Sequence, residues 1–211
     1  MKTKNSIYGK IAAIVITAIV AVPLPGRAQL TDHGYFDIDW QFNIPLNTGF
    51  ADKAAGWGMA MDGGYYITDN IAVGAFFAYS TNNKYVGTQT LQICDNASVT
   101  TDQQHSMFQL PFGVSARYRF VPDAIATPYI SLKLGPAYTK FYSYYNAFQS
   151  SDDGWGFYIC PEIGATIYFT SNNMVGLHLA LYYNYSTNRA DVLTYRIEGL
   201  NNAGFRAGLS F

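Results

Sequence analysis

The sequence predicts an all-β fold, an eight-stranded, antiparallel, up-and-down transmembrane β-barrel. Three observations predict it. Apolar and polar residues alternate with a period of two in eight separate segments. One side of each segment carries apolar residues and no charged residue. The connections between the segments are short and long in turn, which is typical of barrels that cross a membrane.

The first 28 residues have the features of a secretory signal peptide, which leaves 29–211 as the barrel domain. Three lysines precede an apolar run over 11–22, and Ala28 ends a site of small residues suited to cleavage. Removing this segment leaves nine basic against 14 acidic residues. Because the mature chain is net negative, nucleic acid is not expected as a partner. No later apolar run approaches the ~20 residues of a spanning helix.

The first strand is expected over residues 36–44, where the alternation is clearest. Successive side chains of a strand point to opposite faces, so this segment has one apolar and one polar face. Its apolar face carries Phe36, Ile38, Trp40, Phe42 and Ile44, and its polar face carries Asp37, Asp39, Gln41 and Asn43.

Seven further segments repeat this pattern, and each is expected to be a strand. In chain order they cover 57–67, 71–79, 108–120, 129–138, 155–169, 175–184 and 203–211. Their apolar faces include, in the same order, Met59 and Met61, Val73 and Phe77, Phe112 and Val114, Ile130 and Leu132, Ile163 and Ile167, Leu179 and Leu181, and Phe205 and Leu209.

The charged residues of these strands all fall on the polar faces. They are four acids and four bases: Asp37, Asp39, Asp62, Arg117, Arg119, Lys133, Glu162 and Arg206. Glycine, alanine and serine lie beside them, which suits the crowded interior of a narrow barrel. On the lipid side an arginine or lysine would cost roughly 2–4 kcal/mol. The sequence therefore predicts a luminal network of paired charges that fills the interior, with a gated ion path as the alternative.

The connections assign the two ends of the barrel. Short connections are expected over 68–70, 121–126 and 170–173, and long polar ones over 46–56, 81–107, 142–154 and 186–202. Short turns on one side and long loops on the other are the asymmetry of outer-membrane barrels. Both termini are therefore expected in the periplasm, and the four long loops outside the cell.

An aromatic residue, Phe211, closes the last alternating strand, which resembles the assembly signal of bacterial outer-membrane barrels. The pattern over 35–211 resembles the small eight-stranded OmpA/OmpX-like and OmpW-like proteins and the porin-like small barrels of Bacteroidetes. The resemblance implies a place in the outer-membrane bilayer and folding by the barrel-assembly machinery. It implies no cofactor.

Histidines are the first candidates for chemistry. The resemblance implies that a small barrel acting on lipid A would place a histidine beside a serine or an acid at the level of the outer leaflet. His105 and Ser106 are the only such neighbours, but a histidine at the rim is more often solvated. His178 is expected in the lumen as a hydrogen-bonding partner. No cysteine or histidine cluster has the spacing of a metal site.

The two cysteines leave two alternatives. Cys94 lies in the longest expected loop and Cys160 near the outer end of the sixth strand. Because the periplasm is oxidising, a disulfide between them could fasten that loop over the barrel mouth. Otherwise both are free thiols, since the sequence does not show whether the two Cα atoms come within about 7 Å.

Aromatic residues in the third long loop are candidates for contact with a partner. They are Tyr142, Tyr144, Tyr145 and Phe148. They could bind an extracellular protein or glycan, or Tyr142 and Tyr144 could merely continue a strand above the membrane. We therefore expect a structural or surface-interaction protein that is not an enzyme and acts through its four loops.

Two other functions stay open. One is an OmpW-like transporter of small apolar molecules, which would need a lateral opening, and Pro136 and Pro161 on neighbouring strands could weaken the wall. We expect no open gap there. The other is a lipid A-modifying enzyme.

Overall fold

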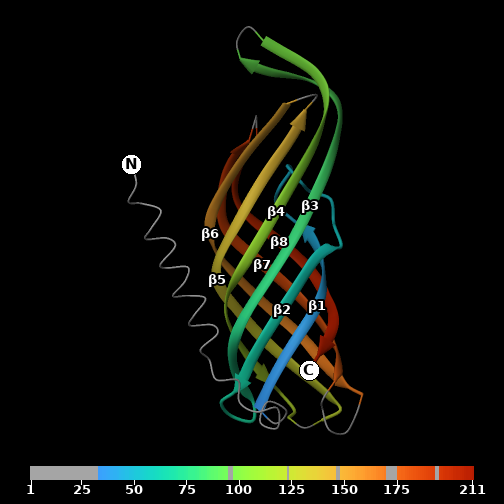
Figure 1. Ribbon diagram of the computed structural model, residues 1–211, viewed down its shortest axis with the longest axis vertical. Coiled ribbons are helices and arrows are strands. Elements are labelled where there is room, and N and C mark those ends of the chain that lie inside the picture. Colours follow the sequence, from blue (N-terminus) through green and yellow to red (C-terminus); the bar gives the residue numbers. More distant parts are fainter. Residues whose placement is uncertain (1–32, 95–96, 123, 146–147, 170–174, 193–194) are drawn as a thin grey trace, which may run out of the picture.

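Eight long strands follow one another around a closed ring in the computed structural model (Figure 1). The structure describes residues 33–211 except 95–96, 123, 146–147, 170–174 and 193–194, so the predicted signal peptide lies outside the described residues. The strands are β1 (Gly34–Pro45), β2 (Trp57–Tyr66), β3 (Ile71–Cys94), β4 (Ala97–Arg119), β5 (Ala126–Tyr145), β6 (Phe148–Tyr168), β7 (Gly176–Val192) and β8 (Tyr195–Ser210). Each is antiparallel to the next, and β1 pairs with β8. The predicted fold class is confirmed.

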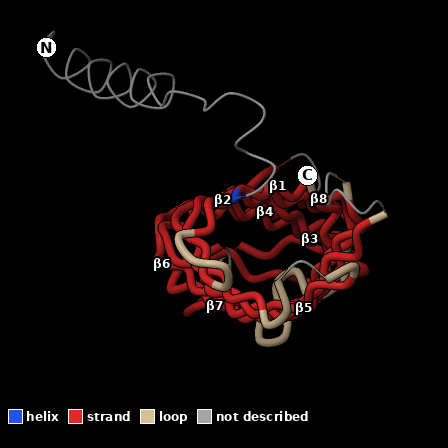
Figure 2. The backbone as a smooth tube through the Cα atoms, turned by 90° about the horizontal axis from the view of Figure 1, so that it is seen from below, coloured by secondary structure: helices blue, strands red, loops and turns tan. Residues whose placement is uncertain are grey.

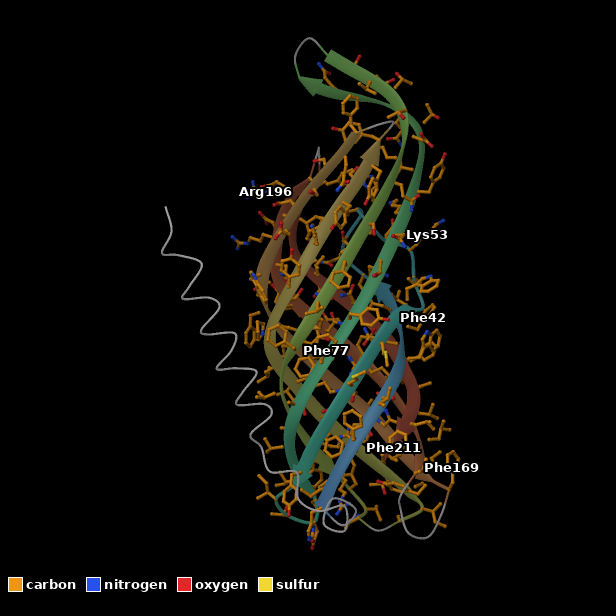
Figure 3. All side chains as sticks on the ribbon, viewed as in Figure 1. Phe42, Lys53, Phe77, Phe169, Arg196 and Phe211 are labelled. Atoms are coloured by element: carbon orange, nitrogen blue, oxygen red, sulfur yellow. The ribbon has the colours of Figure 1, made fainter. Side chains whose placement is uncertain are left out.

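The polar face of each strand lines the interior of the ring. In β1, Asp37 and Asp39 are buried, whereas Phe36 and Trp40 are 45% and 47% exposed. Phe77 and Phe169 likewise stand on the outer surface (Figure 3). This reverses the arrangement of a soluble sheet, because hydrocarbon surrounds the barrel and favours apolar side chains outside. No helix in the described part of the chain is long and apolar enough to cross a membrane.

The last residue closes the seam of the ring. Phe211 and Phe36 exchange two backbone hydrogen bonds, with N···O distances of 2.9 and 2.8 Å. Above them the β1–β8 ladder runs from the Asp37–Ser210 pair to the Pro45–Asn202 pair. Gly208 lies within this ladder, and a Cβ atom there would approach the Ile38 carbonyl oxygen to 2.0 Å. The seam therefore needs a glycine at that position.

Three segments expected to be long loops are mostly paired strand. β3 has 24 residues and β4 has 23, and together they continue far above the rest of the ring (Figure 1). The β5–β6 and β7–β8 hairpins replace the other two expected loops. Threonine, tyrosine, valine and isoleucine in these segments favour strands, and a ladder outside the membrane requires no strict apolar alternation.

Residues 46–56, the fourth expected loop, are not a strand and fold inward between β1 and β2. Asn43 and Ala55 form an isolated bridge across the base of this loop. Phe50 and Ala51 near its tip are fully buried. The tip therefore packs inside the upper end of the ring.

The two prolines interrupt pairing, but not between β5 and β6. That ladder is continuous from Ala126 to Tyr145. Instead, the β4–β5 register skips Pro136, and the β6–β7 register skips Pro161. Each proline lacks an N–H on the side that faces its other neighbour. The weakness considered between β5 and β6 is therefore not in that ladder, and, as expected, no gap opens in it among the described residues.

Candidate functional site

The lower interior holds a network of buried charges, and Arg117 is at its centre. Its Nη2 atom lies 2.5 Å from Asp37 Oδ2 and 3.3 Å from Asp62 Oδ2. The guanidinium also lies between two tyrosine rings, 3.8 Å from the centroid of Tyr35 and 4.1 Å from that of Tyr129. Cation–π contact adds to ion pairing where water is excluded. Arg117 therefore joins the walls formed by β1, β2, β4 and β5.

Glu162 is the second centre of the network. Lys133 Nζ lies 3.0 Å from each of its carboxylate oxygens, and Arg206 pairs with the same carboxylate. Lys133 also lies 3.1 Å from Asp62, which links this group to Arg117. All these charged groups are buried, where an unpaired ion is costly and a well-paired one is tolerated.

His178 connects Glu162 to Asp39. Its Nδ1 lies 2.7 Å from Asp39 Oδ1, and its Nε2 lies 2.5 Å from the Tyr129 hydroxyl. That hydroxyl in turn donates a hydrogen bond to Glu162 Oε1 at 2.9 Å. The sequence placed His178 in the lumen but not in the ionic network, and it did not identify Tyr129. The sequence signal that could have identified both residues was their position on the luminal faces of β7 and β5.

Arg119 is the one predicted member of the network that lies elsewhere. It is only partly buried, at the lower rim, where its guanidinium lies 4.0 Å from the Tyr66 ring centroid. Its Nε donates to the Asp69 carbonyl in the β2–β3 turn. Arg119 has the luminal parity but stands at the end of β4, below the acids. The other seven predicted residues are brought together.

Above the charges lies a layer of amides and hydroxyls that join strands which are not neighbours in the ring. Asn43 donates to Asn82 at 2.7 Å, Gln109 to Ser186 at 2.8 Å, and Tyr182 to Asn43 Oδ1 at 2.9 Å. These contacts join β1 to β3, β4 to β7, and β7 to β1. The lower and middle interior is therefore crossed by side chains at two successive levels.

The two cysteines are not joined. Cys160 is a free, buried thiol that packs with Phe76, Tyr158 and Tyr182 in the middle of the barrel. Cys94 ends β3 at the tip of the β3–β4 hairpin, and its side chain lies outside the described part of the structure. A strand rises roughly 3.3 Å per residue, so the stretch of β3 from Phe76 to Cys94 spans tens of ångströms. The structure therefore does not form the disulfide considered above, because the hairpin carries Cys94 away from the mouth.

The upper interior is apolar on one side. Its cluster consists of Phe50, Ala51, Met107, Phe141, Ala190, Val192, Ile197 and Leu200, with Tyr195 packed against it. The inward-folded loop supplies two of these residues. The Phe50 ring centroid lies 4.4 Å from that of His105, 5.5 Å from Tyr195 and 5.8 Å from Phe141.

His105 lies inside this cluster, not in a solvated loop at the rim. The outward-facing aromatic residues Phe108 and Tyr118 mark the two ends of the part of β4 that crosses the membrane, which takes about 9–11 residues. His105 stands above Phe108 and therefore above this part of the strand. Burial, helped by the nearby Lys84 ammonium, lowers the pKa of the imidazole. Ser106 is its neighbour on β4, and its side chain faces the opposite side of the sheet.

The predicted contact residues lie on the upper hairpins. Tyr142 and Tyr144 are stacked, with ring centroids 6.0 Å apart, and both belong to β5. Tyr145 and Phe148 face each other across the β5–β6 turn at the same centroid distance. Beside Tyr144 a cleft of about 260 Å³ is lined by Tyr85, Asp102, Gln104 and Tyr144. The cluster is thus part of a paired sheet.

No group of three or more histidine, cysteine or acidic residues that could hold a metal ion occurs among residues that the structure describes. The acids of the lower interior are instead used by Arg117, Lys133, His178 and Arg206.

Comparison with known proteins gives a family and several structural relatives. The sequence model of the family described as "Outer membrane protein beta-barrel domain" matches residues 13–211. The outer membrane protease OmpT of Escherichia coli has a TM-score of 0.52 and 8% identity, over 86% of this chain and 97% of that chain. Neisserial surface protein A has a TM-score of 0.48 and 16% identity, over 84% and 95%.

Ail, the attachment invasion locus protein of Yersinia pestis, solved with the heparin analogue sucrose octasulfate, has a TM-score of 0.47 and 14% identity, over 85% of this chain and 98% of that chain. At such identities the likeness concerns the fold alone. No curated protein sequence matches the chain.

Proposed function

Since this chain belongs to the family of outer membrane protein beta-barrel domains, we propose that it is a closed anchor in the outer membrane that presents a protruding sheet for contact with other molecules. The observation that carries the proposal is the length of β3 to β6. About 9–11 residues suffice to cross the membrane, yet β3 and β4 have 24 and 23. The excess residues remain paired and form a sheet above the ring (Figure 1).

This protruding sheet has two edges on which a partner strand could pair. The ladder of β3 with β2 ends at Thr81. The ladder of β6 with β7 ends at Tyr158, and the side chains of Thr187 and Asn188 still bond the β6 backbone at Phe157 and Gly154, so the open edge of β6 begins above them. An unpaired strand edge offers backbone donors and acceptors to an extended segment of another chain. Tyr85, Tyr144 and Phe148 are exposed on the same sheet and add aromatic contacts for a protein or glycan.

The closed interior supports an anchor over a transporter. An eight-stranded barrel is just wide enough for its own side chains, and here charges, amides and the Phe50 loop occupy successive levels. Ion pairs at the lowest level and hydrogen bonds at the next join strands that are not neighbours in the ring. This arrangement also supports a non-enzymatic role, because the histidines are engaged in packing or in the ionic network.

We place the short turns and both termini in the periplasm and the long hairpins outside the cell, as in outer-membrane barrels generally. In this orientation residues 1–28 act as the signal peptide and are removed. Phe211 then serves as the signal read by the barrel-assembly machinery, and its position at the β1–β8 seam suits a residue that guides closure.

Two measurements, ion conductance and cell adhesion, test the proposal on the wild type and on two variants with shortened hairpins. The first variant replaces residues 88–100 by a short turn, and the second also replaces 144–149. We expect both to fold and neither to conduct ions in planar bilayers, as for the wild type. Cells that display the wild type should adhere to gelatin-coated (protein) or mucin-coated (glycan) surfaces, and the shortened variants should lose this adhesion. Steady conductance of the wild type, or adhesion independent of the hairpins, would refute the anchor-and-display role.

A further inference from the structure

Phe50 fills an aromatic box in the upper interior. The walls are His105 on β4, Phe141 on β5 and Tyr195 on β8, and the last two meet the Phe50 ring nearly edge-on at interplanar angles of 74° and 75°. The His105 and Tyr195 rings are themselves 5.1 Å apart. The box is thus built from three strands of the barrel, and a ring carried by a separate loop occupies it.

Polar side chains beside the box lack partners. Gln103, His105 and Ser143 are at most 2% exposed. Both amide atoms of Gln103, both ring nitrogens of His105 and the hydroxyl of Ser143 find no hydrogen-bond partner among the described residues. His105 pairs with Ser143 across the β4–β5 ladder, and Gln103 is the next luminal residue of β4. Together they form a polar stripe of donors and acceptors that the hydrocarbon ring of Phe50 cannot satisfy.

Apart from the burial of Phe50 and Ala51, the loop that carries Phe50 is held mainly by polar contacts at the surface. Lys84 donates to the Gly49 carbonyl at 2.9 Å and pairs with Asp52 at 2.6 Å. Asn47 bonds the Gly199 carbonyl and the Asn201 amide on the other side. Exposed ion pairs contribute little, so the loop can leave the box without disturbing the strand ladders.

We propose that this box, once vacated by Phe50, binds a small uncharged aromatic molecule that bears a hydroxyl or N–H group, such as a phenol or an indole. The ring of the ligand takes the place of the Phe50 ring, and its polar group meets the polar stripe of Gln103, His105 and Ser143. The walls carry no charged residue that would pair with an ionic ligand. Phe50 is then an intramolecular competitor for the site. This inference is independent of the hairpins and goes beyond the proposed surface role.

The test compares 4-fluorophenol with fluorobenzene, which lacks the hydroxyl, by ¹⁹F NMR on the full chain in nanodiscs. Empty nanodiscs correct for partition into lipid. Phe50→Ala should bind 4-fluorophenol at least ten-fold more tightly than the wild type, because the competitor is gone. Phe169→Ala, which changes an exposed aromatic residue at the opposite end of the barrel, should bind like the wild type. Phe50→Ala should bind fluorobenzene at least ten-fold more weakly than 4-fluorophenol.

A second pair of variants keeps the test decisive if Phe50→Ala does not fold. Lys84→Ala releases the loop and should tighten 4-fluorophenol binding several-fold, whereas Lys53→Ala, on the same loop (Figure 3), should not. Adding Gln103→Leu to Phe50→Ala should remove most of the preference for 4-fluorophenol over fluorobenzene. Equal affinity for the two probes, or no gain in Phe50→Ala and Lys84→Ala over their controls, would overturn the proposed site.

Discussion

At the scale of single residues, His178 takes the place in the lower interior that the sequence assigned to Arg119. Its Nδ1 lies 2.7 Å from Asp39 Oδ1, and its Nε2 lies 2.5 Å from the Tyr129 hydroxyl. The same hydroxyl donates a hydrogen bond to Glu162. His178 therefore links the β1 acid Asp39 to the group around Glu162, whereas Arg119 lies at the lower rim.

Among the buried acids, Glu162 should lower the stability of the barrel most when it is replaced. Replacing it by glutamine leaves Arg206 and Lys133 without their shared carboxylate, and breaking a buried pair costs about 3–5 kcal/mol. The matched control is Glu198→Gln, whose partner Arg196 is exposed at the upper rim (Figure 3), so about 0–1 kcal/mol is expected. Urea unfolding in detergent, followed by gel mobility, measures both. Equal midpoints for the two variants would mean that the lower interior is hydrated.

At the scale of elements, the loop over 46–56 depends on the upper interior more than on its own sequence. It is fixed by Phe50 inside and by Lys84 and Asn47 at the surface. The strands around it are held by ladders that the loop does not share. A local opening of this loop is therefore expected to need less free energy than the unfolding of any strand.

Acidification should open this loop. The pKa of His105 is lowered in the closed state by burial and by Lys84. A histidine with a lowered pKa disfavours the folded state once protonated, so the stability of the closed loop is complete above the ordinary pKa of 6.5 and falls as pH decreases through the lowered value. Lys84 from β3, Asp52 from the loop, and Ser143 and Tyr195 from β5 and β8 are the polar groups around it.

Hydrogen exchange measured by mass spectrometry checks this prediction. Residues 46–56 should exchange faster at pH 5 than at pH 7.5 after correction for the intrinsic rate, while the β5–β6 ladder stays protected. In His105→Phe, which cannot be protonated, the change with pH should disappear. If that variant keeps the full pH dependence, His105 is not the group responsible.

Phe211, which directly follows β8, gives a prediction for assembly. Phe211→Ser keeps the backbone bonds to Phe36 but removes the exposed aromatic ring. We expect this variant to refold in detergent with nearly the wild-type yield, and to accumulate several-fold less in the outer membrane of cells. Leu209→Ser, on the same outward face two residues earlier, is the control for lost lipid contact. Equal membrane levels of Phe211→Ser and wild type would exclude the signal role.

At the scale of the whole molecule, the interior is layered along the barrel axis. Ion pairs fill the lower part, amides and hydroxyls the middle, and an apolar cluster the top. Exposed apolar side chains such as Phe77 and Phe211 stand on the outside of the ring (Figure 3). Figure 2 shows the ring of strands that separates the interior from the outside. The barrel wall thus keeps charged side chains away from lipid while they pair with one another.

Eight strands and the face of each that meets lipid could be predicted from the sequence alone, because alternation is a local property of an extended chain in hydrocarbon. The same alternation placed seven charged residues inside. Which of these residues meet depends on strand register and strand length around the closed ring. These put Arg119 at the rim, bring His178 between Asp39 and Tyr129, and carry Cys94 away from Cys160.

The inward fold of Phe50 and the continuation of β3 to β6 as a sheet were also beyond the sequence pattern. Segments outside the membrane are not required to alternate, so a polar loop and a water-exposed strand have similar composition. Whether such a segment pairs or folds inward depends on the neighbours that closure of the barrel provides, and these lie far away along the chain.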